Sequence, residues 1–177
     1  MPEQIRNVFH GRVLTLNLER VRLPNGRVAE LEIAHHPGGA AVVAVDAGGR
    51  VCLLRQYRHA AGGWLQELPA GKLDGGEPAL TCARRELEEE AGVRAGRWDE
   101  LGEYFSSPGV LTEVIHLYLA RDLVPVDARP EEHEVLEAYW LPLDEAVGLA
   151  AGGHLKDGKS IIGLLWAQAR LQAEGES

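Results

Sequence analysis

Residues 71–93 read GKLDGGEPALTCARRELEEEAGV, and this stretch decides both the expected fold and the expected chemistry. A glycine pair leads into a proline that suits the first turn of a helix. The helix is predicted to run from Pro78 to Ala91 and to end at Gly92, a residue type common just beyond helix ends. The apolar residues that predict its buried face recur at helical spacing: Leu80, Ala83, Leu87 and Ala91.

Three glutamates, Glu86, Glu89 and Glu90, share one side of this predicted helix, next to the apolar face. Like charges at this spacing destabilise a helix by roughly a few tenths of a kcal/mol per pair. They also lie near the C-terminal end, where the helix dipole disfavours anions. Clustered carboxylates beside a core face therefore indicate a hard divalent cation, Mg²⁺ or Mn²⁺. For three glutamates taken alone, the alternative is a solvated acidic face.

The glutamates occur together with Gly71, Glu77, Arg85 and Gly92 at fixed intervals. This arrangement resembles the Nudix box of Nudix hydrolases. That pattern is a glycine, five residues, a glutamate, seven residues, then Arg-Glu-apolar-x-Glu-Glu-x-Gly-apolar, and every specified position is met. The resemblance implies an α/β fold, the α/β/α sandwich of Nudix domains with a mixed sheet. It also implies metal-dependent hydrolysis of a nucleoside diphosphate linked to another group.

The resemblance also implies roles for individual residues. Glu86 and Glu90 would be direct metal ligands, and the backbone carbonyl of Ala70 would complete a metal site. Glu89 would bind a further metal or act through water, and Arg85 would orient the glutamates. The expected metal is Mg²⁺, with Mn²⁺ possible, and it would polarise the phosphoryl oxygens and lower the pKa of the attacking water.

Sequence beyond the box is similar to the ADP-ribose pyrophosphatase branch of the family. The similar stretches are HHPGGAAVVAV at 35–45, RQYRHAAGGWLQELPAGKLDGGE at 55–77 and KDGKSIIGLL at 156–165. Pro108 lies 15 residues after Val93, a mark associated with this branch. The expected reaction is hydrolysis of ADP-ribose to AMP and ribose 5-phosphate. GDP-mannose or another nucleoside diphosphate sugar is the alternative, because these marks are partly shared.

Four residues are expected to bind substrate. Arg58 and Arg55 would hold the diphosphate through bidentate hydrogen bonds, unless they are surface arginines on a strand end. By resemblance, Glu113 would contact the ribose or the metals. Glu67 would orient the substrate or the loop at the metal site.

The general base remains open among Glu131, Glu132 and Glu134, which lie in the segment ARPEEHEVLE. In the resembled branch, the base lies on a mobile loop, and matching backward from LPLDEA points to Glu132. A loop that closes only over bound substrate would protect the reaction from bulk water. The alternative is a solvated acidic loop.

Overall composition limits the classes of partner. The 177 residues carry 18 Lys and Arg against 27 Asp and Glu, a net charge of −9, which argues against nucleic acid and anionic membranes as partners. No apolar run approaches the roughly 20 residues of a membrane span, and the first residues show no signal-peptide pattern. With only Cys52 and Cys82, which form no CxxC pair, we expect a reduced, cytoplasmic protein.

Two units are expected, an N-terminal β subdomain at 1–37 and a Nudix domain at 38–177. The first has alternating strand-like segments around Pro24-Asn25-Gly26, a strong hairpin signal, and is too small to be stable alone. By resemblance, it would exchange across a homodimer and contribute to the partner's pocket.

A non-catalytic ADP-ribose sensor is the alternative from another class, but such modules typically lose the box glutamates. Further strands are expected at 101–106, 114–120 and 134–141, and further helices at 144–151 and 160–173.

Overall fold

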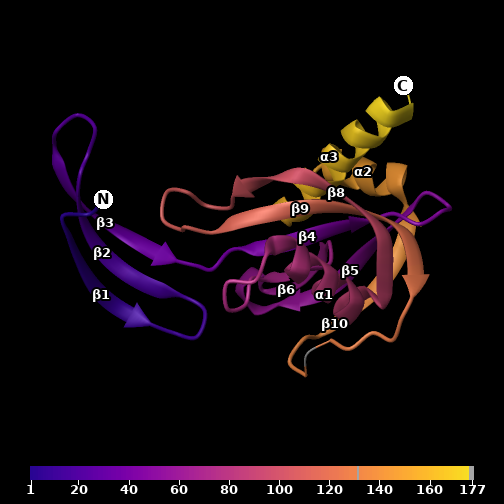
Figure 1. The fold of residues 1–177 in the computed structure, drawn as a ribbon, viewed down its shortest axis with the longest axis horizontal. Helices are drawn as coiled ribbons and strands as arrows, with labels where there is room; N and C mark the ends of the chain where they lie inside the picture. The colour runs from indigo at the N-terminus through magenta and orange to yellow at the C-terminus, as the bar shows by residue number, and fades with distance from the viewer. Residues whose placement is uncertain (131, 176–177) are drawn as a thin grey trace.

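Strands β1 (Gln4–His10), β2 (Thr15–Arg22) and β3 (Val28–His35) form an antiparallel sheet that projects from one end of the molecule (Figure 1). The structure is a computed structural model and describes residues 1–130 and 132–175. The turn between β2 and β3 has the expected hairpin chemistry. Gly26 adopts φ 80°, and the N–H of Arg27 donates to Oδ1 of Asn25 at 3.0 Å.

The rest of the chain builds two sheets and three helices. One sheet has the order β10-β5-β6, and the other has the order β7-β4-β9-β8, in which β4 and β9 run parallel. The bounds are β4 (Gly39–Ala44), β5 (Arg50–Arg58), β6 (Gly63–Glu67), β7 (Ala70–Lys72), β8 (Val93–Phe105), β9 (Val114–Pro125), β10 (Leu136–Pro142), α1 (Ala79–Ala91), α2 (Leu143–Ala151) and α3 (Gly158–Gly175), with a short 3-10 helix at His59–Ala61.

The core lies on both faces of β4, which is buried along its whole length. Alternate side chains of a strand point to opposite faces. Accordingly, Val43 packs with Leu164 of α3 on one face, and Val42 packs with Leu87 of α1 on the other. Helix α1 therefore covers one side, and α2 and α3 cover the other. The predicted α/β/α sandwich with a mixed sheet is confirmed.

Strand β8 is longer than the sequence predicts. It begins at Val93, immediately after the helix, whereas the expected strand began at 101. Charged residues and Gly96 weaken the strand pattern in this stretch, and the pairing with β9 overrides it. A register shift between Glu100 and Gly102 bends the strand, and Gly102 has φ 143°. The three predicted helices agree with the structure to within two residues at each end.

Both cysteines, Cys52 and Cys82, are buried and free. No helix within residues 1–130 and 132–175 combines the length and the apolar character needed to cross a membrane.

Candidate active site

Helix α1 carries acidic residues on its buried side. Residues Cys82, Ala83, Glu86, Leu87 and Glu90 are all buried, so two of the box glutamates lie beside core side chains. The helix ends at Gly92, which has φ 62° and donates its N–H to the carbonyl of Glu88. A residue with a side chain would be strained in this left-handed conformation, which explains why the box has a glycine at this position.

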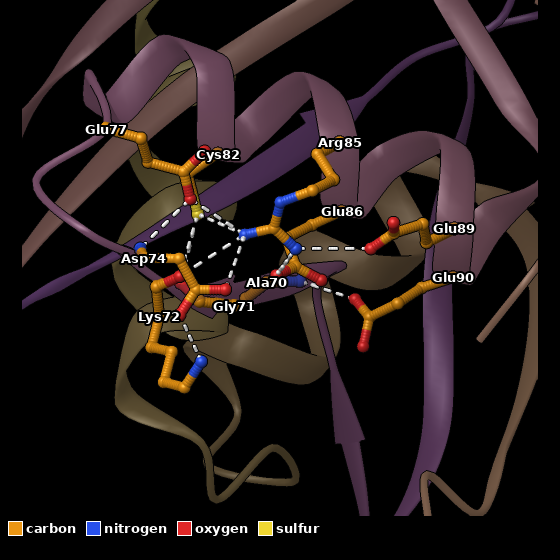
Figure 2. A network of polar contacts seen from close by, with 10 residues as sticks. All are labelled: Ala70, Gly71, Lys72, Asp74, Glu77, Cys82, Arg85, Glu86, Glu89 and Glu90. Atoms are coloured by element: carbon orange, nitrogen blue, oxygen red, sulfur yellow. Dashed lines mark hydrogen bonds and ion pairs between the residues drawn. The ribbon is translucent and has the colours of Figure 1, made fainter. Parts of the chain in front are cut away.

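Arg85 is the centre of the polar network in the box (Figure 2). Its Nη1 donates to Glu86 at 2.6 Å and to Glu89 at 3.2 Å, and its Nη2 donates to Glu77 at 2.9 Å. These hydrogen bonds join the loop at Glu77 to the helix, and the positive charge of Arg85 partly offsets the three carboxylates. The hydrogen bond from Arg85 also lowers the pKa of Glu77.

Glu90 is 2% exposed and tied to the loop that enters the box. Its Oε2 accepts the backbone N–H of Ala70 at 2.8 Å (Figure 2). Its Oε1 is buried and has no hydrogen-bond partner among the described residues. Burial raises the pKa of Glu90 to about 8; the N–H of Ala70 opposes this shift, and the charges of Glu86 and Glu134 add to it. Burial likewise raises the pKa of Glu86.

These properties fit a divalent cation. A buried carboxylate oxygen without a donor is costly unless a positive charge faces it. Oxygen ligands are what Mg²⁺ and Mn²⁺ prefer. In the described part of the chain, no three acidic, histidine or cysteine side chains converge as a finished metal cage. Glu86 faces Arg85 instead, so cation binding would require this carboxylate to turn.

Gly71 allows the loop and the helix to approach each other. A Cβ on Gly71 would lie 1.7 Å from Oε1 of Glu86, which is far closer than any real contact. The glycine at the start of the box therefore makes room for a box carboxylate.

A cavity of about 740 Å³ opens over this region. Its wall includes Ala70, Arg85 and Glu86 from the box segment, together with Arg58 from β5 and Glu113 from the loop before β9. The structure thus brings together site residues up to 55 positions apart in the chain, Arg58 and Glu113. Lining residues that the sequence analysis did not single out include Arg12, Val13, His36, Tyr104, Asp157 and Lys159.

Arg58 lines the cavity, and its guanidinium is hydrogen-bonded to Glu67. Its Nε and Nη2 each donate to one carboxylate oxygen of Glu67 at 2.9 Å. Glu67 is only 1% exposed and is not part of the cavity wall. Burial opposes its charge, but Arg58 and Lys159 outweigh burial and lower the pKa of Glu67. Glu67 therefore holds Arg58, and the planar guanidinium can present its remaining edge to a ligand.

Glu113 lies in the loop before β9, next to the point where the end of β3 contacts that loop. The N–H of Ala34 donates to the carbonyl of Val110, and the N–H of Thr112 donates to the carbonyl of Ala34. The Oε1 of Glu113 lies 3.2 Å from Nδ1 of His36. The N-terminal sheet is thereby joined to the loop that carries Glu113.

The acidic segment before β10 gives different positions to the candidate bases. Glu134 is half-buried and lines the cavity with His133. Glu132 is exposed and is not among the cavity-lining residues. Glu131 lies outside the described residues.

Arg55 is not brought to this cavity. Its guanidinium stacks over Trp64 at 4.1 Å and lies 3.5 Å from a carboxylate oxygen of Glu137. It borders a separate, smaller cavity of about 310 Å³. Of the two arginines expected to bind the diphosphate, Arg58 lines the larger cavity and Arg55 does not.

Comparison with known families decides the identity of this chain. Residues 35–162 match the model of the NUDIX domain, which is most of the chain. The chain belongs to the Nudix family. The Nudix box predicted at 71–93 lies inside the matched region, so the family expected from the sequence is confirmed.

Relatives of this Nudix protein match most of its length. The ADP-ribose pyrophosphatase of Bacillus subtilis is 35% identical over 171 residues, covering 94% of this chain and 92% of the relative. The methanol dehydrogenase activator of Bacillus methanolicus is 37% identical, covering 91% and 88%. The GDP-mannose pyrophosphatase of Yersinia enterocolitica serotype O:8 is 36% identical, covering 77% and 76%.

A solved structure described as an ADP compounds hydrolase superimposes with a TM-score of 0.84. It is 22% identical and covers all of this Nudix protein and 96% of its own chain. This likeness supports the fold, including the projecting N-terminal strands.

Proposed function

We propose that this Nudix hydrolase cleaves ADP-ribose to AMP and ribose 5-phosphate with a divalent metal, Mg²⁺ in preference to Mn²⁺. The observation that carries the proposal is that the box carboxylate Glu86 and the anchored arginine Arg58 line one cavity of about 740 Å³. Box carboxylates suit metal ions, and Arg58 suits a diphosphate. The extent of the similarity to an ADP-ribose pyrophosphatase supports the choice of substrate.

Metal binding is assigned to Glu86 and Glu90, with the carbonyl of Ala70 as a third ligand. When bound, the metal supplies Lewis-acid activation of the phosphoryl oxygens and of the attacking water. Glu89 would bind a further metal directly or through water. Arg85 orients Glu86 and Glu89, because it already contacts both at 2.6 and 3.2 Å.

Substrate binding is assigned to Arg58 and Glu113. Arg58 would bind the diphosphate with the edge of its guanidinium that does not face Glu67. Glu113, which also lines the cavity, would accept hydrogen bonds from ribose hydroxyls. Glu67 takes part by holding Arg58, and Arg55 has no contact with the cavity from which to argue a role.

The general base is assigned to the segment before β10. We favour Glu134, because it lines the cavity, whereas Glu132 points to solvent. A carboxylate at this place can accept the proton of the attacking water while Glu86 and Glu90 hold metal. Glu132 remains the alternative if this segment moves when substrate binds.

GDP-mannose is the alternative substrate, favoured by the similarity to a GDP-mannose pyrophosphatase. The non-catalytic sensor is the alternative from another class. Intact box glutamates argue against a sensor, because a binding module has no need of a carboxylate as costly to bury as Glu90.

Turnover of a substrate panel tests these proposals. The purified protein is incubated with Mg²⁺ or Mn²⁺ and with ADP-ribose, GDP-mannose, ADP-glucose, NADH or diadenosine polyphosphates, and phosphate is measured after phosphatase treatment. Fastest turnover of ADP-ribose with Mg²⁺ is expected. Preference for GDP-mannose would overturn only the choice of ADP-ribose as substrate. Absence of any turnover would overturn the proposed hydrolase activity.

We also propose that residues 1–37 form a dimerisation unit beside a Nudix domain at 38–177, in a cytoplasmic homodimer. The projecting sheet leaves large apolar side chains exposed, and a second copy would cover them. Light scattering of the wild-type protein should give the mass of two chains. The Phe9→Asp variant should give a mass closer to that of a single chain. The exposed apolar residues are Ile5, Val8, Phe9, Val28 and Leu31.

A further inference from the structure

Four charged side chains meet where the start of α3 lies against the end of β6; Glu67 is buried, and the other three are partly exposed. Lys159 donates to Oε2 of Glu67 at 2.5 Å and to Oδ1 of Asp157 at 3.0 Å. Arg58 occupies the other side of Glu67. Two cations thus balance two carboxylates, and Lys159 and Glu67 are 92 positions apart in the chain. The sequence contains no pattern that joins them.

The same turn of α3 also holds the backbone of the loop after β6. Ser160 is fully buried, and its Oγ accepts the N–H of Leu68 at 2.7 Å. The hydroxyl donates to Oδ2 of Asp157 at 2.5 Å, and the same oxygen accepts the N–H of Ser160 at 3.1 Å. Asp157 is therefore the N-cap of α3, and it fixes Lys159 and Ser160 together.

Three consecutive residues of this loop are each anchored by a different element. Leu68 is held by Ser160 of α3. The carbonyl of Pro69 accepts the N–H of Val42 in β4 at 2.9 Å. The N–H of Ala70 donates to Glu90 of α1. The direction of the Ala70 carbonyl, assigned above as a metal ligand, depends on all three anchors.

A purely stabilising role does not account for this group. Exposed ion pairs contribute little to stability, and buried ones are often replaced by apolar residues without loss. Both cations of the group, Arg58 and Lys159, line the cavity. Both cations also contact Glu67, the residue just before the loop at the site, which indicates a role in positioning that site.

We propose that residues 157–160 form a clamp with two arms, in which Lys159 positions Arg58 through Glu67 and Ser160 positions the Ala70 carbonyl through Leu68. This inference rests on the proposed hydrolase function for the first arm only. The first arm sets the affinity for the diphosphate, and the second sets the affinity for the metal. Neither residue needs to touch the reacting atoms, so both are positioning residues.

The two arms are separated by two measurements on the full-length protein. Equilibrium Mn²⁺ binding without substrate is followed by electron paramagnetic resonance, and KM and kcat for ADP-ribose are measured at saturating Mg²⁺. Lys159→Met should raise KM about 10-fold and change kcat less than about 3-fold, and Lys159→Arg should restore KM. Ser160→Ala should weaken Mn²⁺ binding about 5-fold with KM nearly unchanged.

Lys156→Met is the matched control, because this exposed lysine contacts only the carbonyl of Gly153 among the hydrogen bonds described for it. Both quantities should stay at their wild-type values. If Lys159→Met does not fold, Lys159→Gln replaces it, since glutamine keeps a donor without the charge. Unchanged KM in the Lys159 variants together with unchanged Mn²⁺ binding in Ser160→Ala would overturn the clamp. If the wild-type protein hydrolyses nothing, the proposed function fails, and Mn²⁺ binding by Ser160→Ala still decides the second arm.

Discussion

The carboxylate of Glu90 and the backbone N–H of Ala70 are joined by a 2.8 Å hydrogen bond between two elements of the box, α1 and β7. This contact uses one carboxylate oxygen and leaves the other buried without a donor among the described residues. The helix, the loop and the expected metal therefore meet at one side chain. The charge state of Glu90 is therefore expected to affect metal binding, turnover and the pH dependence of stability.

Glu90→Gln should lower turnover more than about 100-fold, as expected for loss of a metal-binding charge. Glutamine keeps the shape of the side chain and can still accept the N–H of Ala70. Steady-state kinetics at several Mg²⁺ concentrations measure the effect. Glu88→Gln is the control, because Glu88 pairs with Arg94 on the outer side of α1. Turnover within about 3-fold of wild type in Glu90→Gln would remove Glu90 from the metal site.

The stability of the metal-free protein should fall as pH rises from about 5 to 8. The pKa of Glu90 is about 8 in the folded protein and near 4.5 when the side chain is unperturbed. Between these values, the folded protein holds a proton that the unfolded chain has released, so unfolding becomes more favourable with rising pH. Melting in EDTA should show Glu90→Gln more stable than wild type at pH 8.5 and similar at pH 5. Parallel pH dependences for the two proteins would contradict this assignment.

Gly71→Ala should fold normally but bind metal weakly. The new methyl group would meet Oε1 of Glu86 at 1.7 Å, and a flexible side chain can move away at small cost in stability. The methyl group would occupy space that the Glu86 carboxylate needs to turn toward the metal, and Mn²⁺ binding should weaken about 10-fold or more. Gly148→Ala in α2 is the control, since a Cβ there meets nothing within 4 Å. Wild-type Mn²⁺ affinity in Gly71→Ala would show that Glu86 is no ligand.

Arg58→Lys should raise KM about 10-fold with a smaller effect on kcat, because lysine keeps the charge and loses the bidentate geometry. Arg94→Lys, at an exposed ion pair with Glu88, should behave like wild type. A change in kcat alone would place Arg58 at the reaction step and not in substrate binding.

Glu134→Gln should lower kcat about 100-fold or more without weakening Mn²⁺ binding, whereas Glu132→Gln should stay close to wild type. The reason is position, because Glu134 lines the cavity and Glu132 is exposed. The rate is measured across pH, since loss of a base removes the acidic limb of the profile. The reverse result would return the assignment to Glu132.

Much of the site could be predicted because the Nudix box is local. The spacing of Glu86 and Glu90 on one turn of helix places both carboxylates on one face, whatever the rest of the chain does. Gly71 and Gly92 mark backbone positions that only glycine fills comfortably. The hairpin at Asn25-Gly26 is likewise local. These features follow from helix geometry and backbone sterics, and the structure contains each of them.

Contacts between distant segments could be decided only by the tertiary structure. Arg58 and Arg55 look equivalent in the sequence. They lie three positions apart on β5, so their side chains point to opposite faces of the strand, and only Arg58 lines the cavity. Strand alternation does not separate Glu134 from Glu132; the path of the segment before β10 places only Glu134 at the cavity. The joining of Lys159 to Glu67 depends on how α3 packs over the sheet. Sequence determined the chemistry of the box, and packing determined which other charges share its cavity.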